Sequence, residues 1–375
     1  MGKNRAKVVH LTSVHPPFDT RIFEKECRSL AEAGYDTVLV APHEKPEVVR
    51  GVRIRPVPHG SSRWNRVTRV TRAVYRAALE EDGDLYHFHD PELLPAGLAL
   101  KRLGKRVVYD VHEDMPRNIL SKYWIPRATR RPISYLTESL EGRAARVLDA
   151  IVAATPPIAR RFSSGRTVTV MNFPRLEENE LVEPLDYESR PLEFAYVGSL
   201  SAVRGAREMV QAIGALSGHP SARLVIAGRF YPPALADELA ACPGWDRTDA
   251  LGWCERSQLA GVLNRARAGL ATLHPTESFV ESYPTKLFEY MSFGVPVIAS
   301  DFPIWRNIVL GAGAGLVVDP TSPEAIADAL AWILEHPREA AEMGKRGRAA
   351  AYAKYDWTSQ ARILLALYEE LLGST

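Results

Sequence analysis

Short apolar runs and amphipathic stretches alternate along most of this chain. Residues 7–12, 36–41 and 107–112 are runs rich in Val and Leu, of the length of a buried strand. The stretch 20–33 has apolar residues at helical spacing and is followed by Gly34, which is typical of a helix end. Strand, helix and strand in succession predict a βαβ unit with parallel strands. The predicted fold class is therefore α/β with a doubly wound sheet.

The same alternation restarts in the second half. Strands are predicted at 192–197, 222–227 and 268–273, and helices at 206–216, 255–266, 323–335, 338–354 and 357–372. Between the halves, residues 173–190 are rich in proline and acidic residues and have no periodicity, which is typical of a linker. We expect domains at 1–172 and 191–355, joined by the linker 173–190 and followed by a terminal helical segment, 356–375. A length of 375 residues suits two domains.

The stretch from Glu281 to Gly294 carries the clearest candidate chemistry. Pro284 suits the first turn of a helix, Gly294 suits its end, and 295–299 reads as a buried strand. The free amides of a first helical turn bind phosphate oxygens well. Glu281 would precede this turn and Glu289 would lie in the second, so the pattern predicts a ligand with both phosphate and sugar hydroxyls. The alternative is a solvated surface helix with no binding role.

Composition and cysteine spacing narrow the class of protein. Apolar residues make up 46% and charged residues 25%, as in soluble globular proteins. We find neither an apolar run of about 18 residues nor a signal peptide, so we expect a cytoplasmic protein. Three widely spaced cysteines favour reduced thiols and argue against a zinc site. The loop 13–20 has no glycine, which excludes a dinucleotide-binding fingerprint.

Positive charge is concentrated in the first half. Residues 1–170 contain 29 Lys and Arg against 19 Asp and Glu, which predicts an anionic partner. Arginines at 63, 66, 69, 72 and 76 would share one face of a helix, and 122–131 mixes basic and aromatic residues. We expect peripheral association with an anionic membrane or a lipid-phosphate acceptor and no binding of nucleic acid. A solvated basic face is the alternative.

Histidines gather at two predicted strand ends. His87 and His89 are two residues apart, and His112 follows the strand 107–111. Imidazoles beside carboxylates are metal ligands in many enzymes, so a metal-dependent hydrolase using His87, His89 and His112 is a rival interpretation. The carboxyl ends of parallel strands also converge in any enzyme of this fold class, which explains the clustering without a metal.

Glu281 and Glu289 are separated by seven residues and are followed by a predicted helix end and a Gly-Val-Pro-Val strand. This pattern resembles the donor-site motif of family 4 retaining glycosyltransferases. The similarity extends over the whole chain in the right order. It implies the GT-B fold, in which two doubly wound Rossmann-like domains face each other across a cleft and the C-terminal helix crosses back to the N-terminal domain. It also implies transfer of a sugar from a nucleotide-diphosphate sugar to a hydroxyl acceptor, with retention and without metal or cofactor.

The resemblance also implies roles for individual residues. His112 and Glu281 would be catalytic, and Glu289 would bind the ribose. In the family, the turn after Gly198 carries an arginine and a lysine that bind the diphosphate. Here these positions hold Ser199 and Arg204, so Lys286 is a candidate for the missing charge. The full expected donor-binding set is Gly198, Ser199, Arg204, Gly228, Trp253, Cys254, Ser282, Tyr283, Pro284, Thr285, Lys286 and Glu289.

The acceptor is expected at the first domain. Pro17, Asp19 and Arg21 follow its first strand, although Asp19 is equally suited to cap a helix. A lipid-linked or cell-surface polysaccharide acceptor, or a small molecule, would fit, and the enzyme would then work in the cytoplasm or at the inner face of the plasma membrane. A sugar-nucleotide epimerase or hydrolase and a non-catalytic two-lobed binding protein remain alternatives.

Overall fold

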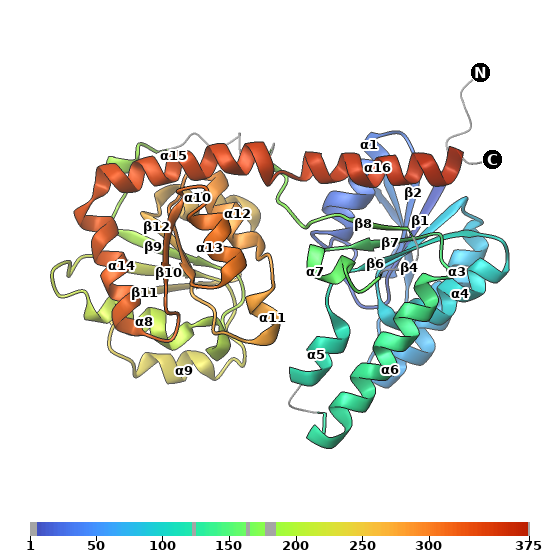
Figure 1. Cartoon of the computed structure of the whole chain (residues 1–375), viewed down its shortest axis with the longest axis horizontal. Coiled ribbons are helices and arrows are strands. Elements are labelled where there is room, and N and C mark those ends of the chain that lie inside the picture. Colours follow the sequence, from blue (N-terminus) through green and yellow to red (C-terminus); the bar gives the residue numbers. More distant parts are fainter. Residues whose placement is uncertain (1–5, 122–124, 163–165, 177–184, 374–375) are drawn as a thin grey trace. The chain divides into compact units, whose positions relative to one another are not determined.

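The computed structural model describes residues 6–121, 125–162, 166–176 and 185–373 (Figure 1). The chain divides into an N-terminal unit, Met1–Asn172 with Trp357–Thr375, and a C-terminal unit, Phe173–Asp356. Residues 122–124 of the predicted basic and aromatic segment and 177–184 of the predicted linker lie outside the described residues. No helix in the described ranges is both long and apolar enough to span a membrane.

The N-terminal unit is built on an 8-stranded sheet with the order β3-β4-β2-β1-β5-β6-β7-β8. Only the pairing of β3 with β4 is antiparallel, and the other neighbours are parallel, as the βαβ pattern predicts. The strands are β1 (Lys7–Leu11), β2 (Asp36–Pro42), β3 (Glu47–Val49), β4 (Val52–Val57), β5 (Leu85–Phe88), β6 (Arg106–Val111), β7 (Ala150–Ala153) and β8 (Thr167–Thr169).

Alternate residues of these strands face two different helical layers. Val9 of β1 packs in a cluster with residues of α3, α4 and α7, whereas Val8 packs with α1 and the C-terminal helix α16. The predicted helix 20–33 forms as a π-helical segment η1 followed by α1. The helical segments are η1 (Ile22–Cys27), α1 (Arg28–Glu32), α2 (Arg63–Asn65), η2 (Arg66–Val70), α3 (Thr71–Glu81), η3 (Pro91–Leu93), α4 (Leu94–Arg102), α5 (Met115–Ser121), α6 (Arg127–Ala145), α7 (Pro156–Ala159) and α16 (Trp357–Gly373).

The C-terminal unit has a 6-stranded parallel sheet with the order β11-β10-β9-β12-β13-β14. Counted within the unit this is the order 3-2-1-4-5-6 of a Rossmann sheet, whose strand order reverses between β9 and β12. Ligands of such sheets bind beyond the carboxyl ends of the strands at this switch point. The strands are β9 (Glu193–Val197), β10 (Arg223–Ala227), β11 (Thr248–Gly252), β12 (Ala268–Ala271), β13 (Val297–Ser300) and β14 (Gly315–Val318).

Helices of the C-terminal unit cover its sheet, and α8 and α14 share its largest apolar cluster with β9 and β10. The helix of the candidate motif is α12, which begins at Thr285; Pro284 is its N-cap, with extended ψ, and not part of the first turn. Gly294 follows the helix with φ of 62°, as predicted. The helical segments are η5 (Tyr187–Ser189), η6 (Ala202–Arg204), α8 (Ala206–Ala215), α9 (Leu235–Ala240), η7 (Trp245–Arg247), α10 (Arg256–Arg265), α11 (Glu277–Val280), α12 (Thr285–Ser292), α13 (Pro303–Val309), α14 (Pro323–Glu335) and α15 (Pro337–Lys354).

The described ends of the predicted linker are part of the C-terminal unit. The ring of Phe173 lies 4.9 Å from that of Phe288 and 5.4 Å from that of Tyr355. At the other end, Tyr187 is buried and donates a hydrogen bond to the carbonyl of Arg267. These contacts are apolar or buried, so these residues pack as part of a domain. The predicted α/β class with two parallel-sheet domains is confirmed.

Candidate active site

Two glycines bring neighbouring loops together at the switch point of the C-terminal unit. Gly198 directly follows β9 with φ of 110°, a conformation that side chains rarely adopt. Gly228 directly follows β10, and a Cβ there would collide with the carbonyl oxygen of Gly198. The Gly198 amide also donates a hydrogen bond to the carbonyl of Ala227. Both glycines are therefore required for this close backbone approach.

Lys286 places an unpaired ammonium group at this turn. Its Nζ is buried, makes no hydrogen bond, and lies 3.8 Å from the ring centre of Tyr196. A Cβ added at Gly198 would lie 3.9 Å from the same nitrogen. Burial, together with the charge of Arg204, lowers the pKa of Lys286 to about 7, against the opposing attraction of Glu289. A lysine in the first turn of a helix is also disfavoured by the helix dipole, so an anionic ligand would relieve both effects.

Arg204 provides a second positive charge on the same loop. It ends the short helix η6, is half-buried, and donates a hydrogen bond of 2.7 Å from Nη1 to the carbonyl of Ser199. The Ser199 side chain is exposed, and its carbonyl also accepts from the Tyr196 hydroxyl. The loop thus holds the guanidinium near Lys286, close enough to lower the lysine's pKa. Two cations beside a helix N-terminus make this part of the C-terminal unit a suitable diphosphate site.

The two glutamates of the motif differ in exposure. Glu281 is exposed immediately after α11, and Glu289 is half-buried in the second turn of α12. Tyr283, Pro284 and Thr285 lie between them, half-buried, at the start of the helix. The backbone amide of Ser282, a member of the expected donor-binding set, donates to the carbonyl of Phe279 and is therefore not free for a phosphate.

Trp253 and Cys254, two residues of the expected donor-binding set, follow β11. Trp253 is 70% exposed, and the guanidinium of Arg229 lies 5.4 Å from its ring centre. Cys254 is buried, with its thiol 3.7 Å from the carbonyl oxygen of Gly252. A base could therefore stack on the indole, whereas the thiol faces the protein.

Sequence reasoning missed two tyrosines that support this site. Tyr290 is fully buried; its hydroxyl accepts from the amide of Val197 and donates to the carbonyl of Leu270, so it links α12 to β9 and β12. Tyr196 provides the ring against which the Lys286 ammonium lies. Both occupy apolar positions of their elements, so nothing in the sequence pattern separates them from ordinary core residues.

His112 lies at a strand end of the N-terminal unit, as predicted. It follows β6, and its Nε2 lies 2.8 Å from Oδ2 of Asp110 and 3.1 Å from Nδ1 of His89. Its side chain is 15% exposed, whereas those of Asp110 and His89 are fully buried. Burial lowers the pKa of His89 to about 4, against the attraction of Asp110. His112 is thus held by buried partners while part of its ring remains accessible.

The structure corrects the expected acceptor residues. Arg21 is buried and donates to both oxygens of Asp110 and to the carbonyl of Val170, so its guanidinium is not available to an acceptor. Pro17 is also buried. Asp19 accepts from the amides of Arg21 and Ile22, which is the capping role that the sequence left open. These hydrogen bonds, with that of His15, hold the pKa of Asp19 below its usual range although burial opposes them.

The three histidines of the predicted hydrolase site do not form one cluster. His87 belongs to a buried group with His10, Glu26 and His89, and His112 belongs to a second group with His89 and Asp110. The ring of His87 is directed to Glu26 and the hydroxyl of Tyr368. The single ligand set proposed for a hydrolase is therefore wrong.

Solved structures similar to this chain share the whole fold. Sucrose-phosphate synthase from Thermosynechococcus elongatus matches with a TM-score of 0.77 at 19% identity, covering 99% of this chain and 100% of that chain. Anabaena Alr3699/HepE in complex with UDP and glucose matches with a TM-score of 0.73 at 14% identity, covering 98% of this chain and 100% of that chain. At such identities the likeness shows the GT-B fold alone.

Sequence comparisons give the family. Residues 21–170 match the family described as Glycosyltransferase Family 4, and residues 177–350 match Glycosyl transferases group 1. A phosphatidyl-myo-inositol mannosyltransferase from Mycobacterium leprae is 32% identical over 93% of this chain and 89% of its own length. A GDP-mannose-dependent alpha-mannosyltransferase from Mycolicibacterium smegmatis is 25% identical over 92% of this chain and 91% of its own length. The comparisons do not favour an epimerase or a hydrolase. The chain belongs to the family 4 glycosyltransferases.

Proposed function

We propose that this glycosyltransferase takes its sugar from a nucleotide-diphosphate sugar bound at the switch point of the C-terminal unit. The observation that carries the proposal is the buried, unpaired ammonium of Lys286 beside Gly198, with Arg204 on the same loop. Negative charge builds on the diphosphate as it leaves, and two fixed cations stabilise that charge. Lys286 thereby replaces the cation that the family places at the position of Ser199.

The remaining donor contacts follow from the same geometry. Amides of Thr285 and Lys286 at the start of α12 would face phosphate oxygens. Glu289 would accept from ribose hydroxyls, Glu281 would bind a hydroxyl of the transferred sugar, and the exposed Trp253 would lie beside the base. Mannose is the first sugar to test, because four of the similar proteins are named as mannosyltransferases.

Transfer would proceed with retention and without an added metal ion or cofactor. Retaining glycosidases use two carboxylates about 5 Å apart as nucleophile and acid–base pair. Here the two glutamates of the motif are proposed to bind hydroxyls, so the leaving diphosphate is the base that deprotonates the acceptor on the same face. His112, with its buried partners and accessible ring, is the proposed catalytic residue of the N-terminal unit.

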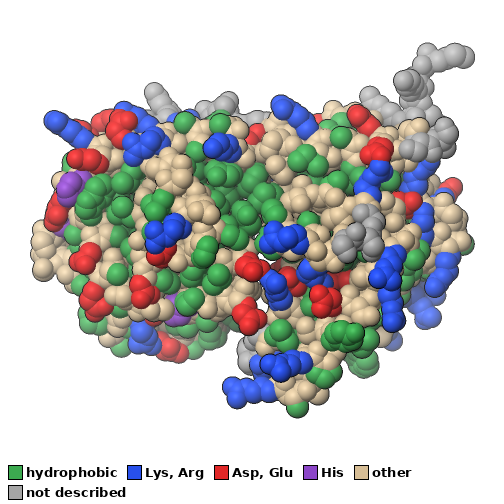
Figure 2. Space-filling view, in the orientation of Figure 1, with side chains coloured by type: hydrophobic (Ala, Val, Ile, Leu, Met, Phe, Trp, Pro, Cys, Tyr) green, Lys and Arg blue, Asp and Glu red, His purple; other side chains and the backbone are tan. Residues whose placement is uncertain are grey.

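Basic and apolar side chains on the N-terminal unit favour a lipid-linked acceptor at an anionic membrane. Arg69, Arg72 and Arg76 are exposed on η2 and α3, and Trp64 is 79% exposed nearby in the sequence. The part formed by α5 and α6 presents hydrophobic and basic side chains together (Figures 1 and 2). Exposed residues of α6 include Ile133, Leu136 and Leu140, which recur at helical spacing. Cosedimentation with phosphatidylglycerol vesicles, absent with phosphatidylcholine vesicles, tests this part of the proposal.

A panel of GDP-mannose, UDP-glucose, TDP-glucose and ADP-glucose tests the donor directly. Thermal stabilisation by one nucleoside diphosphate identifies the base, since a ligand of the folded state raises the melting temperature. Product formation on a lipid acceptor is then followed without added metal, and proton NMR of the new linkage is compared with the donor anomer. Stabilisation by none of the diphosphates contradicts the donor site, and an inverted anomer contradicts retention.

A further inference from the structure

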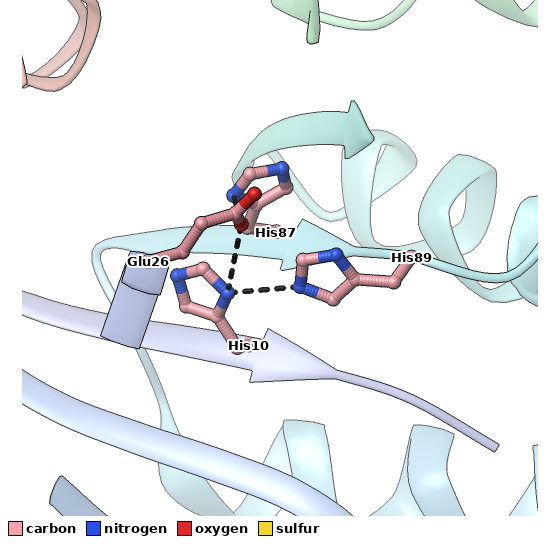
Figure 3. A group of neighbouring side chains, drawn as sticks. All are labelled: His10, Glu26, His87 and His89. Carbon is pink, nitrogen blue, oxygen red and sulfur yellow. Dashed lines mark hydrogen bonds and ion pairs between the residues drawn. The ribbon is translucent and has the colours of Figure 1, made fainter. Parts of the chain in front are cut away.

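Four potential metal ligands meet in the interior of the N-terminal unit (Figure 3). His10 of β1 and His87 of β5 are direct neighbours in the sheet register, and both point to the face that α16 covers. His89 follows β5, and Glu26 reaches the group from η1. None of the four side chains is more than 3% exposed. Such positions are normally apolar, so four polar side chains together require an explanation.

The ligand atoms have spacings suited to a single small cation. Nδ1 of His10 lies 2.9 Å from Nε2 of His89 and 3.9 Å from Oε2 of Glu26, and Nδ1 of His87 lies 3.9 Å from the same oxygen. Zinc bonds of about 2.0–2.1 Å in a tetrahedron place neighbouring ligand atoms about 3.3 Å apart. The observed spacings bracket this value. Small side-chain adjustments would therefore bring all four atoms to one ion.

The surrounding groups resemble an outer shell around a metal site. Nδ1 of His89 faces Oδ2 of Asp110 at 3.3 Å, and Nε2 of His10 faces the hydroxyl of Tyr368 at 3.2 Å. Metal-binding histidines usually donate their second ring N–H to a carboxylate or another oxygen in this way. Oε1 of Glu26 lies 3.1 Å from Nε of Arg21. These outer contacts leave Nδ1 of His10, Nε2 of His89 and Oε2 of Glu26 as the inner atoms. Nδ1 of His87 lies 2.6 Å from the Tyr368 hydroxyl, so coordination by this nitrogen would replace that hydrogen bond.

The carboxylate of Glu26 is the strongest indication that this cluster of four side chains binds a cation. Both of its carboxylate oxygens are buried without a hydrogen bond, although Arg21 lies close to one of them. Arg21 also pairs with Asp110, so one guanidinium faces two buried carboxylates. A buried carboxylate without hydrogen bonds is costly unless a cation or a proton neutralises it. Coordination of a cation by Oε2 would satisfy the carboxylate.

We propose that His10, Glu26, His87 and His89 bind one divalent first-row transition-metal ion, zinc in the first instance, as a structural ion of the N-terminal unit. Three imidazoles and one carboxylate are ligands that zinc accepts, and four protein ligands leave no open position for a substrate. The ion would hold β1, β5 and η1 together and fix His89 beside His112. This site is independent of the proposed donor chemistry, which uses the C-terminal unit.

Metal content of the purified protein tests the proposal. The full chain is produced in zinc-supplemented medium, passed over a chelating resin in its native state, and analysed by inductively coupled plasma mass spectrometry. We expect about one zinc ion per chain, retained because the ligands are buried. A chain that is folded by circular dichroism but contains no stoichiometric metal overturns the proposal, and the excess charge is then neutralised by a proton on Glu26.

Matched variants locate the ion. Glu26→Gln and His87→Gln should each lower the zinc content at least tenfold, whereas His112→Gln, outside the four ligands, should retain it. Zinc lost from His112→Gln but retained in His87→Gln would place the ion in the His89, Asp110 and His112 group and overturn this assignment. Cobalt incorporated into the wild-type chain gives a readout that requires no variant. The intense visible absorption of four-coordinate cobalt is expected, and the weak spectrum of a six-coordinate ion would contradict the proposed ligand set.

Discussion

Replacing Lys286 by methionine should stabilise the ligand-free protein while weakening its binding of nucleoside diphosphate. The ammonium is buried against Tyr196 without a hydrogen bond, and its neighbours are the charges of Arg204 and Glu289. Methionine retains most of the apolar stem and removes the buried charge. Opposite effects on stability and binding are expected of a side chain held in place for an anionic ligand.

The pKa of Lys286 gives the size of the expected change in the free energy of unfolding. It falls from 10.5 to about 7 in the folded chain, so the folded state binds fewer protons than the unfolded state between these values. Stability therefore rises with pH from 7 to 10.5. The lowered pKa of Lys286 costs the fold on the order of 4 kcal/mol at pH 7 and about 1 kcal/mol at pH 9.5. Lys286→Met should recover up to these amounts. Loss of a buried charge contact of about 2 kcal/mol or more would weaken diphosphate binding at least about 30-fold.

Urea unfolding at pH 7 and pH 9.5 measures the first effect, and calorimetric titration with the preferred nucleoside diphosphate measures the second. Lys345→Met is the control, because the Lys345 side chain is 74% exposed on α15 and its ammonium pairs with Glu342 at the surface. It should change stability by no more than about 0.5 kcal/mol and leave binding unchanged. Unaltered diphosphate affinity in Lys286→Met, or a loss of stability at pH 7, would refute the reasoning.

Three further predictions concern other parts of the chain. Gly228→Ala should lower stability by about 1–3 kcal/mol and weaken donor binding, because its Cβ collides with backbone. Gly261→Ala, in α10 with open space around it, should instead raise the free energy of unfolding by about 0.5–1 kcal/mol in the same urea experiment. Equal changes in stability for the two glycine variants would contradict the turn geometry at Gly228. Arg21→Met should cost about 3–5 kcal/mol, because it leaves buried carboxylates unpaired, and a neutral result would show that they are protonated. Glu289→Ala should weaken donor binding, while Glu281→Ala should lower turnover more than affinity. Wild-type kinetics in both would remove these two residues from the site.

Local patterns predicted many elements of this fold, although β3, β4, α5 and α6 had not been predicted. The helix predicted at 323–335 is α14 with the same bounds, and Gly294 ends α12 as expected. The spacing of apolar residues indicates which side chains of one element point to the core, and proline and glycine mark where the element ends. The position of α12 was also predicted, except that Pro284 is its N-cap and not a residue of its first turn. Family motifs then gave the strand ends at which to look for a site.

The surroundings of individual side chains were decided only by tertiary structure. Arg21 looked like a loop residue open to an acceptor, but Asp110 and Glu26, which arrive from another strand and from η1, enclose it. The Lys286 ammonium is buried because β9 and its turn cover the start of α12. A sequence pattern shows which way a side chain leaves its own element, but not which distant element lies opposite. The charge and solvation of these groups depend on that partner.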